Sequence, residues 1–410
     1  MSPAGNSAAG LSLGSLLRLM FVLFLAGVAL RMTILAMPPV IPLVHEELHL
    51  SETQVGLLVG LPLAVFALAA VPGSLLIARI GATLAVLVGM IFAALASGAR
   101  GAAIDIWTLY AAAIATGFGV AIMQPGMPTL VRQWLPTRIA LGTVAYTSGM
   151  LIGATVSSAT TIPYILPALR GSWRADMVFW AVPALLIAPV FYLLSPKPSA
   201  RQTASLPIRG RWWPDWNKPL IWLLGLTLGS NNSTFFGANA FIGDYLASQG
   251  KSYLFGPAVG WLNGMQTAAP LLLLVIAGRL ERRAWPFLVF GPLLLAALVA
   301  LIFVQSDLAI LVAAGLVGFT TAMTFAPALA LPAMLSAPGD VARNSAGMFT
   351  VSYTCGIIIP TISGALWDVT GRPWTAFLPM CLCAVMLTVL GTVVTRLPQP
   401  AAKDSAHGAA

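Results

Sequence analysis

The feature that most constrains the fold is a series of long apolar stretches separated by short polar breaks. About 20 consecutive apolar residues form a helix that spans the hydrocarbon core of a bilayer, and twelve stretches of about this length follow one another along the chain. Only 8% of the residues are charged, compared with about 25% in soluble globular proteins. The stretches lie at residues 19–44, 54–78, 83–99, 106–131, 139–166, 175–194, 219–246, 254–278, 285–304, 307–332, 344–367 and 374–395. This pattern predicts an all-α membrane protein with twelve transmembrane helices.

The longest polar break follows the sixth stretch and separates two sets of six predicted helices. One spacing repeats between the sets: Gly119 precedes Pro128 by nine residues in the fourth stretch, and Gly318 precedes Pro327 by nine residues in the tenth. Internal duplication is typical of transporters whose two halves rock about a site near mid-membrane. We therefore expect pseudo-symmetric halves at residues 1–194 and 219–410, joined by a cytoplasmic linker at residues 195–218.

The distribution of lysine and arginine predicts the orientation in the membrane. If the N-terminus is cytoplasmic, fifteen of the 21 basic residues lie in cytoplasmic segments, five lie on the opposite side and Arg31 lies within the membrane. The five on the opposite side are Arg100, Arg170, Arg174, Lys251 and Arg372. Cytoplasmic loops are enriched in lysine and arginine, so both termini and the linker are expected to face the cytoplasm.

Arg31 is the one charged residue in the first apolar stretch, with twelve uncharged residues before it and thirteen after it. A guanidinium does not lose its proton at that depth, and such a group normally faces a cavity or a partner. One interpretation is a helix-packing arginine bonded to backbone carbonyls. We favour a group that binds an anion or a dipole in a water-filled cavity. Pro38, Pro39 and Pro42 are expected to bend or loosen the second half of the same helix.

Three stretches of sequence resemble a known family. They are Leu30-Arg31 followed by Pro38 and Pro42, Ser51 to Leu58 followed by Leu61-Pro62-Leu63, and Gly364-Ala365-Leu366-Trp367-Asp368-Val369-Thr370-Gly371. With the six-plus-six plan, the chain resembles the major facilitator superfamily and, within it, the cyanate/nitroimidazole transporter family. The resemblance implies a carrier in a bacterial inner membrane that works by alternating access, with the first, fourth, seventh and tenth spans lining a central cavity.

Two positions depart from the pattern of those families. Ala78 stands where many superfamily members carry an aspartate in the loop that keeps Arg79 and Gly81, and Gln124 stands where an asparagine is expected in the narrower family. The resemblance therefore does not identify the substrate.

The candidate solute-binding residues are the few polar side chains predicted to lie at membrane depth. Besides Arg31 they are Gln124, Tyr146, Asn231, Asn232, Asn239 and Tyr353. Buried amides often only bond a neighbouring helix, but the run Gly229–Thr234 is too polar for a lipid-facing surface, so we favour a cavity role for it. Phe236 is a possible wall of the site, although an aromatic residue at helical spacing is more often packing. Gly149 and Gly153 are expected to bring two helices into close contact.

No carboxylate is expected at mid-depth, which leaves the coupling mechanism open. Asp105, Asp176 and Asp307 fall at the outer ends of predicted spans, and Asp244 near the outer end of the seventh is a possible coupling or gating residue. Carriers often use an intramembrane carboxylate or histidine as a proton relay. Coupling through substrate protonation, through Asp244 or through no ion at all remain alternatives.

The preferred function is a secondary transporter that moves a small anionic or polar organic solute. The alternatives are a nitrate/nitrite-like anion carrier and a drug or nitroimidazole exporter. An intramembrane enzyme is disfavoured, because the apolar spans contain no histidine, no acidic pair and no His/Cys cluster, and hydrolysis needs such groups. We expect a monomer in the lipid bilayer, with no metal, no cofactor and no bound nucleic acid.

Overall fold

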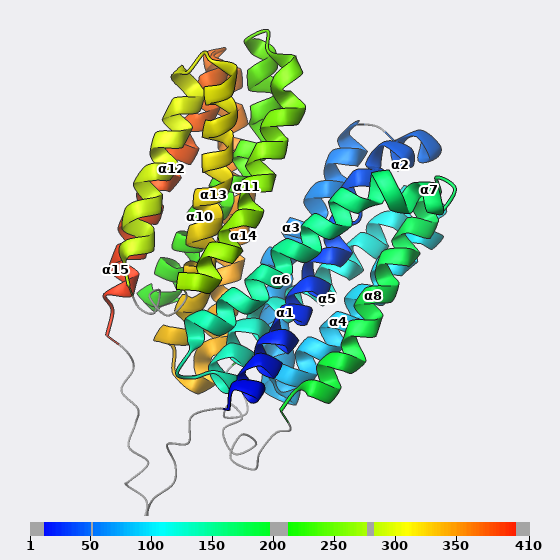
Figure 1. Ribbon diagram of the computed structural model, residues 1–410, viewed down its shortest axis with the longest axis vertical. Helices are drawn as coiled ribbons and strands as arrows, with labels where there is room; N and C mark the ends of the chain where they lie inside the picture. Colours follow the sequence, from blue (N-terminus) through cyan, green and yellow to red (C-terminus); the bar gives the residue numbers. More distant parts are fainter. Residues whose placement is uncertain (1–11, 51, 197–211, 277–282, 399–410) are drawn as a thin grey trace, which may run out of the picture.

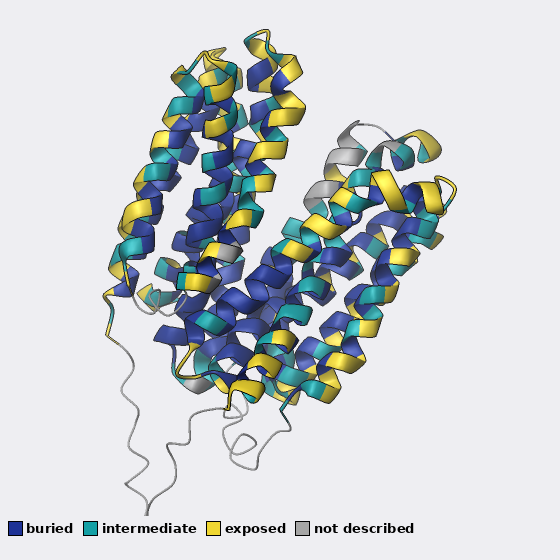
Figure 2. Cartoon of the chain, viewed as in Figure 1, coloured by how far each residue is buried: buried dark blue, intermediate teal, exposed yellow. Residues whose placement is uncertain are grey.

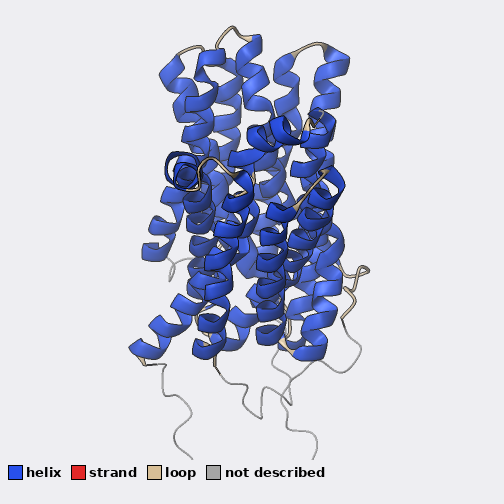
Figure 3. Ribbon diagram, turned by 90° about the vertical axis from the view of Figure 1, so that its right-hand side faces the viewer, coloured by secondary structure: helices blue, strands red, loops and turns tan. Residues whose placement is uncertain are grey.

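The computed structural model describes residues 12–50, 52–196, 212–276 and 283–398, and these ranges are helical with short connections (Figure 3). The long helices of the first half are α1 (Leu13–Leu35), α3 (Glu52–Ile80), α4 (Ala82–Ala99), α5 (Ile106–Trp134), α6 (Ile139–Thr160) and α8 (Trp173–Leu194). Those of the second half are α10 (Pro219–Ser248), α11 (Phe255–Ile276), α12 (Trp285–Phe303), α13 (Asp307–Leu335), α14 (Val341–Thr370) and α15 (Leu378–Thr395). The short helices are η1 (Pro38–Val40), α2 (Ile41–Leu48), η2 (Arg100–Ala102), η3 (Thr161–Ile165), α7 (Leu166–Ala168), η4 (Ser252–Leu254), η6 (Pro338–Asp340) and η7 (Pro373–Phe377).

These helices confirm the twelve predicted spans. Ten candidate spans in the described residues are long and apolar enough to cross a membrane, and α10 and α11 fill the two remaining positions (Figure 1). Most of the predicted linker, residues 197–211, lies outside the described residues, as do both ends of the chain.

The first span differs from the prediction, because α1 ends at Leu35 instead of continuing to residue 44. Pro38 lacks the N–H that would continue the helical hydrogen bonding. The Met37 N–H donates to the carbonyl oxygen of Ile34 at 3.5 Å, so it does not reach the carbonyl of Thr33 as an α-helix would require. Arg31 therefore lies about one turn before the end of its helix, not in the middle.

The two halves repeat the same packing of neighbouring helices. In the first half α1 packs on α6 and α8, while in the second half α10 packs on α14 and α15. The pairs α3–α5 and α4–α5 likewise correspond to α11–α13 and α12–α13. The repeated pairs agree with the duplication that the matching sequence spacings predict.

Glycines bring α1 and α6 together without room for a side chain, as predicted from the sequence. A Cβ atom on Gly149 would lie 2.0 Å from the carbonyl oxygen of Phe24, and one on Gly153 would lie 2.6 Å from that of Val28. Gly27 makes the reciprocal approach, because its Cβ would lie 2.0 Å from the Tyr146 oxygen. The backbones of the two helices are thus in direct contact.

The halves pack against each other at one end of the bundle, which we call the terminal end because α1 starts there and α15 ends there (Figure 1). Residues 119–131 of α5, 328–335 of α13 and 341–349 of α14 are all buried there (Figure 2). Residues 354–370 of α14 are mostly exposed or half-buried, and the two bundles diverge toward this opposite end. The Ser74 hydroxyl of α3 donates to the Trp212 carbonyl oxygen at 2.6 Å and ties the first half to the segment just before α10 at the terminal end.

Candidate solute-binding site

A cavity of about 170 Å³ lies between the N-terminal helices and α10. It extends from Phe66 and Phe236, near the middle of α3 and α10, to Met37 beyond the end of α1. Its described lining consists of Arg31, Ile34, Leu35, Met37, Pro38, Ile41, Leu58, Pro62, Leu63, Phe66, Arg100, Ala113 and Phe236. The two charged members are both arginines, so the described wall is apolar and positively charged.

The guanidinium of Arg31 is partly exposed in this cavity. Its neighbours Leu30 and Met32 are buried against other helices, so α1 turns the position between them toward the cavity. Within the part of the chain that the structure describes, Arg31 has no hydrogen bond and no ion pair. Its five N–H donors therefore remain available to a solute or to water.

Arg31, Gln124 and Tyr353, predicted from distant parts of the sequence, come together at the contact between the halves. The Gln124 amide nitrogen donates to the Tyr353 hydroxyl at 2.9 Å, and Arg31 is close enough to Tyr353 to interact with it electrostatically. The Tyr353 ring also packs against Phe66 of the cavity wall, with centroids 5.0 Å apart. Through Tyr353, these contacts connect the cavity residues Arg31 and Phe66 to α14 of the second half.

Tyr146 lies beneath this group and shares a void of about 10 Å³ with Gln124 and Tyr353. The Tyr146 hydroxyl and the Gln124 Oε1 atom are buried without a hydrogen-bond partner in the described structure. The void is large enough for about one water molecule. Tyr146 is therefore near the cavity but does not belong to its described wall.

The α10 amides make contacts with other helices instead of facing this cavity. Asn231 donates to the Thr321 carbonyl oxygen of α13 at 3.0 Å, and Asn232 donates to the Ser352 hydroxyl of α14 at 2.9 Å. Asn239 donates to the carbonyl of Phe235, one turn earlier in the same helix, and accepts a hydrogen bond from Asn263 of α11 at 2.9 Å. These contacts match the packing interpretation that the sequence left open, while Phe236 is the α10 residue that reaches the cavity.

Asp244 lies one turn before the end of α10 and its side chain is exposed. It makes no ion pair with a described residue. The structure thus places this candidate coupling residue away from the cavity wall.

Arg100 and Asp176 are the residues whose surroundings the sequence did not reveal. Arg100 was expected in an outer loop, but it is 3% exposed and lines the cavity, and Asp176 in the first turn of α8 is 0% exposed. Gly101 allows this burial, because a Cβ there would lie 2.4 Å from the Arg174 carbonyl oxygen. The glycines that flank Arg100, Gly98 and Gly101, were the available sequence signal for close helix packing.

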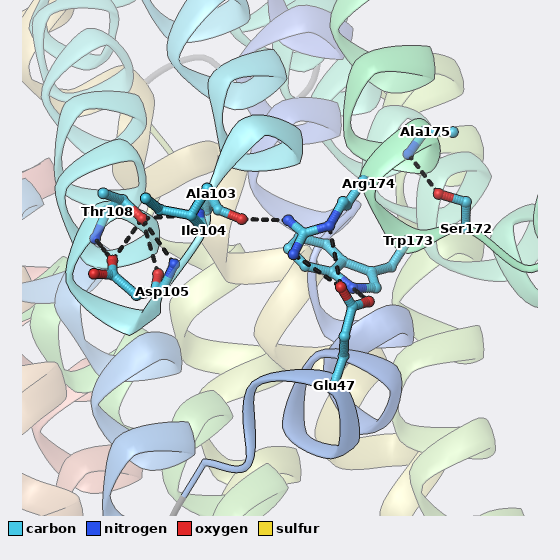
Figure 4. Close-up of polar contacts among 9 residues, drawn as sticks. All are labelled: Glu47, Ala103, Ile104, Asp105, Thr108, Ser172, Trp173, Arg174 and Ala175. Carbon is cyan, nitrogen blue, oxygen red and sulfur yellow. Dashed lines mark hydrogen bonds and ion pairs between the residues drawn. The ribbon is translucent and has the colours of Figure 1, made fainter.

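A polar cluster holds α2 over the end of the first half that is opposite to the terminal end (Figure 4). Glu47 of α2 accepts a hydrogen bond from the Trp173 indole nitrogen and forms an ion pair of 2.8 Å with Arg174 of α8. Arg174 also donates to the Ala103 carbonyl oxygen. The segment after α1, which contributes Met37 and Ile41 to the cavity wall, is therefore anchored to α8.

Comparison with known proteins agrees with this architecture. Residues 19–257 match the family model of the Major Facilitator Superfamily. The chain is 23% identical to the cyanate transport protein of Escherichia coli over 94% of this chain and 100% of that protein. It is 25% identical to the 2-nitroimidazole transporter of the same organism over 90% and 92% of the two chains. The superfamily transporter FucP, solved in the outward conformation, aligns with a TM-score of 0.73 at 13% identity over 93% of this chain and 99% of that chain.

The family match covers more than half of the chain and agrees with the twelve-helix plan described above. The relatives are transporters, not enzymes. This chain belongs to the major facilitator superfamily and is a multi-pass membrane transporter.

Proposed function

We propose that the protein carries a small organic anion, or a strongly polar organic solute, and that Arg31 selects it by charge. The observation that carries this proposal is the unpaired Arg31 guanidinium in a cavity whose described wall contains no acidic side chain. A permanent cation in such a wall repels cations and attracts anions. Its planar fork can bind a carboxylate or a similar group through two parallel hydrogen bonds.

The rest of the cavity wall favours a solute with an apolar body. Phe66, Phe236 and aliphatic side chains surround Arg31. At about 170 Å³, the cavity is smaller than the pockets of about 300–1,000 Å³ that hold drug-sized ligands. A compact organic anion fits this wall better than a large lipophilic drug. The names of the cyanate and 2-nitroimidazole relatives support a small solute but leave its identity open.

We infer that the conformation faces outward. The terminal end is closed by contacts between the halves, whereas the bundles diverge at the other end. If the excess of lysine and arginine places the termini in the cytoplasm of a bacterial cell, the diverging end faces the outside of the inner membrane. Alternating access then requires the contacts at the terminal end to open while the other end closes.

The test is a thermal-shift screen of the purified protein against acetate, benzoate, cyanate, nitrate and 2-nitroimidazole. We expect at least one organic anion to raise the Tm of the wild type and not that of Arg31→Gln. Arg372→Gln is the matched control, because Arg372 is exposed at the outer end and lies outside the described cavity wall. A Tm increase that survives in Arg31→Gln would remove Arg31 from the site, and a response to neutral or cationic compounds alone would favour an exporter.

A further inference from the structure

The second arginine of the cavity, Arg100, differs from Arg31 because protein groups hold it in place. Its Nη2 atom donates to the Thr33 carbonyl oxygen and to the Ser97 hydroxyl, and its Nε atom donates to the Ser97 carbonyl at 3.4 Å. Its Nη1 atom has no hydrogen bond to a described residue. Arg100 thus contributes both a fixed charge and a free donor to the wall that also contains Arg31.

Asp176 lies behind Arg100 and is completely buried. The two side chains interact electrostatically, but they form no ion pair within 4.0 Å in the described structure. Neither carboxylate oxygen accepts a hydrogen bond. A buried carboxylate without hydrogen bonds is unfavourable when ionised, so this group has a physical reason to take up a proton.

Two polar side chains, Trp180 and Thr161, lie beside Asp176 and bond other groups. The Trp180 indole N–H donates to the Thr161 hydroxyl oxygen at 2.9 Å, and the Thr161 hydroxyl donates to the Ser157 carbonyl at 2.7 Å. Both groups still lie near enough to the carboxylate to favour its ionised form, and the charge of Arg100 adds to that effect. Burial opposes them, because it disfavours the charged carboxylate most strongly.

Few other charges affect this pair. The helices that pack on α8 carry Arg18 and Arg31 on α1 and Arg100 in η2, and Arg100 is the charged group that interacts with Asp176. Nearer the surface, Arg174 and Glu47 neutralise each other. The charge of the wall near Arg100 thus depends on whether Asp176 holds a proton.

We propose that Asp176 and Arg100 form a proton-dependent charge switch behind the solute cavity. When Asp176 is ionised it offsets the charge of Arg100, and Arg31 alone attracts the anion. When Asp176 takes a proton from water on the open side, both guanidinium groups act on the cavity and anion affinity rises. Protonation of Asp176 and binding of the anion then favour each other, so the affinity for the anion depends on pH.

This inference rests on the proposed anion carrier, but its first test needs no solute. Infrared difference spectra of the full-length protein in liposomes, recorded between about pH 8 and about pH 5, are expected to show a protonated carboxyl band that is absent in Asp176→Asn. Asp368→Asn, an exposed carboxylate in α14, is the matched control and retains the band. A band that persists in Asp176→Asn would overturn the switch, even if an anion binds at Arg31.

The second test measures the affinity for acetate, benzoate, cyanate and nitrate as a function of pH. We expect wild-type affinity for the bound anion to rise about tenfold from about pH 8 to about pH 5, as one extra charge near the site implies. Asp176→Asn is expected to bind tightly at every pH, and Asp244→Asn is expected to keep the wild-type profile. A wild-type pH profile in Asp176→Asn would contradict the proposal.

The double variant Arg100→Gln/Asp176→Asn controls for misfolding of the single variant. It removes both buried charges together, so neither charge is left buried without the other. It is expected to remain monodisperse and to bind weakly at every pH. If it keeps the wild-type increase in affinity at low pH, the pair has only a structural role. If no anion binds to any form, the proposed function fails, while the infrared measurement still decides whether Asp176 takes up a proton.

Discussion

α1 and α10 occupy corresponding positions in the two halves, yet they use their polar residues differently. Arg31 of α1 leaves its guanidinium unpaired in the cavity, whereas Asn231 and Asn232 of α10 bond α13 and α14. α10 contributes an aromatic ring, Phe236, to the described wall. The comparison teaches that two halves with the same helix packing can differ in chemistry. The first half supplies the charged groups of the cavity, and the amides of the second half bond neighbouring helices.

The change expected to affect this difference most is the loss of the α1 charge. In Arg31→Gln the solute loses two charge-assisted hydrogen bonds, each contributing about 1.5–3 kcal/mol. We expect affinity to fall by at least about 100-fold, measured by titration calorimetry with any anion that the thermal-shift screen identifies. Arg31→Lys is expected to insert and fold normally but to lose most uptake, because an ammonium does not reproduce the planar fork. Full uptake by Arg31→Lys would contradict this role.

The glycine contacts compare how α1 packs on α6 with how α10 packs on α14. A Cβ on Gly149 meets the Phe24 backbone oxygen at 2.0 Å, while a Cβ on Gly229 of α10 meets the Cys355 side chain at 3.0 Å. A backbone oxygen can move away from an added methyl group less easily than a side chain can. Gly149→Ala is therefore expected to lower the free energy of unfolding by about 1–3 kcal/mol, and Gly229→Ala by less. The measurement is the Tm of both variants in one detergent. Equal Tm values would show that both helix pairs tolerate the same added volume.

The α10 amides provide a sharper test of what the second half contributes. If Asn231 and Asn232 are cross-links, Asn231→Ala and Asn232→Ala are each expected to lower stability by about 0.6–1.7 kcal/mol and to leave solute affinity within about threefold. The readouts are the Tm and the dissociation constant of each variant. Weakened affinity with an unchanged Tm would instead support the solute-binding role predicted from the sequence.

The smallest effect is expected at the terminal end of the second half. Asp215 forms ion pairs with Lys218 at 2.7 Å and with Arg343 at 2.8 Å. The hydrogen bond from Lys218 lowers the pKa of Asp215 most, and Arg343 lowers it further. Because Asp215 is partly exposed, Asp215→Asn is expected to remove less than about 1 kcal/mol.

The direction in which the pKa of Asp215 is shifted determines how this small stabilisation depends on pH. The folded-state pKa is depressed, so the stabilisation is complete above the unfolded value of about 3.9 and is lost as the pH falls through the lower folded value. The Tm difference between wild type and Asp215→Asn is therefore expected to be constant above about pH 5 and to shrink below about pH 4. A difference that grows on acidification would contradict this assignment.

The twelve helices were predictable because membrane insertion depends on the summed hydropathy of each stretch, which can be read locally. Arg31 was predictable as a cavity residue because an isolated charge in lipid is so unfavourable. The helix end at Leu35 was missed because proline runs can either bend a helix or end it, and the surrounding contacts decide which occurs.

The surroundings of the remaining site residues depend on which helix faces which. The asparagine run of α10 has the same composition whether it faces a cavity or another helix, and Asn232 meets its partner only through the fold. Arg100 and Asp176 are separated by more than 70 residues in the sequence. Their proximity follows from the packing of α8 on α4, which no local pattern contains.

The early end of α1 has an effect beyond the shape of the helix. Since the Met37 N–H turns to Ile34, the Thr33 carbonyl is released from the helical ladder and becomes the acceptor for Arg100 and for the Ser97 hydroxyl. Arg31 also lies near the C-terminal end of α1, where the helix macrodipole is negative. This partial negative charge stabilises a cation that has no counter-ion. The prolines that end α1 thus leave one backbone oxygen for Arg100 and place Arg31 near the negative end of its own helix.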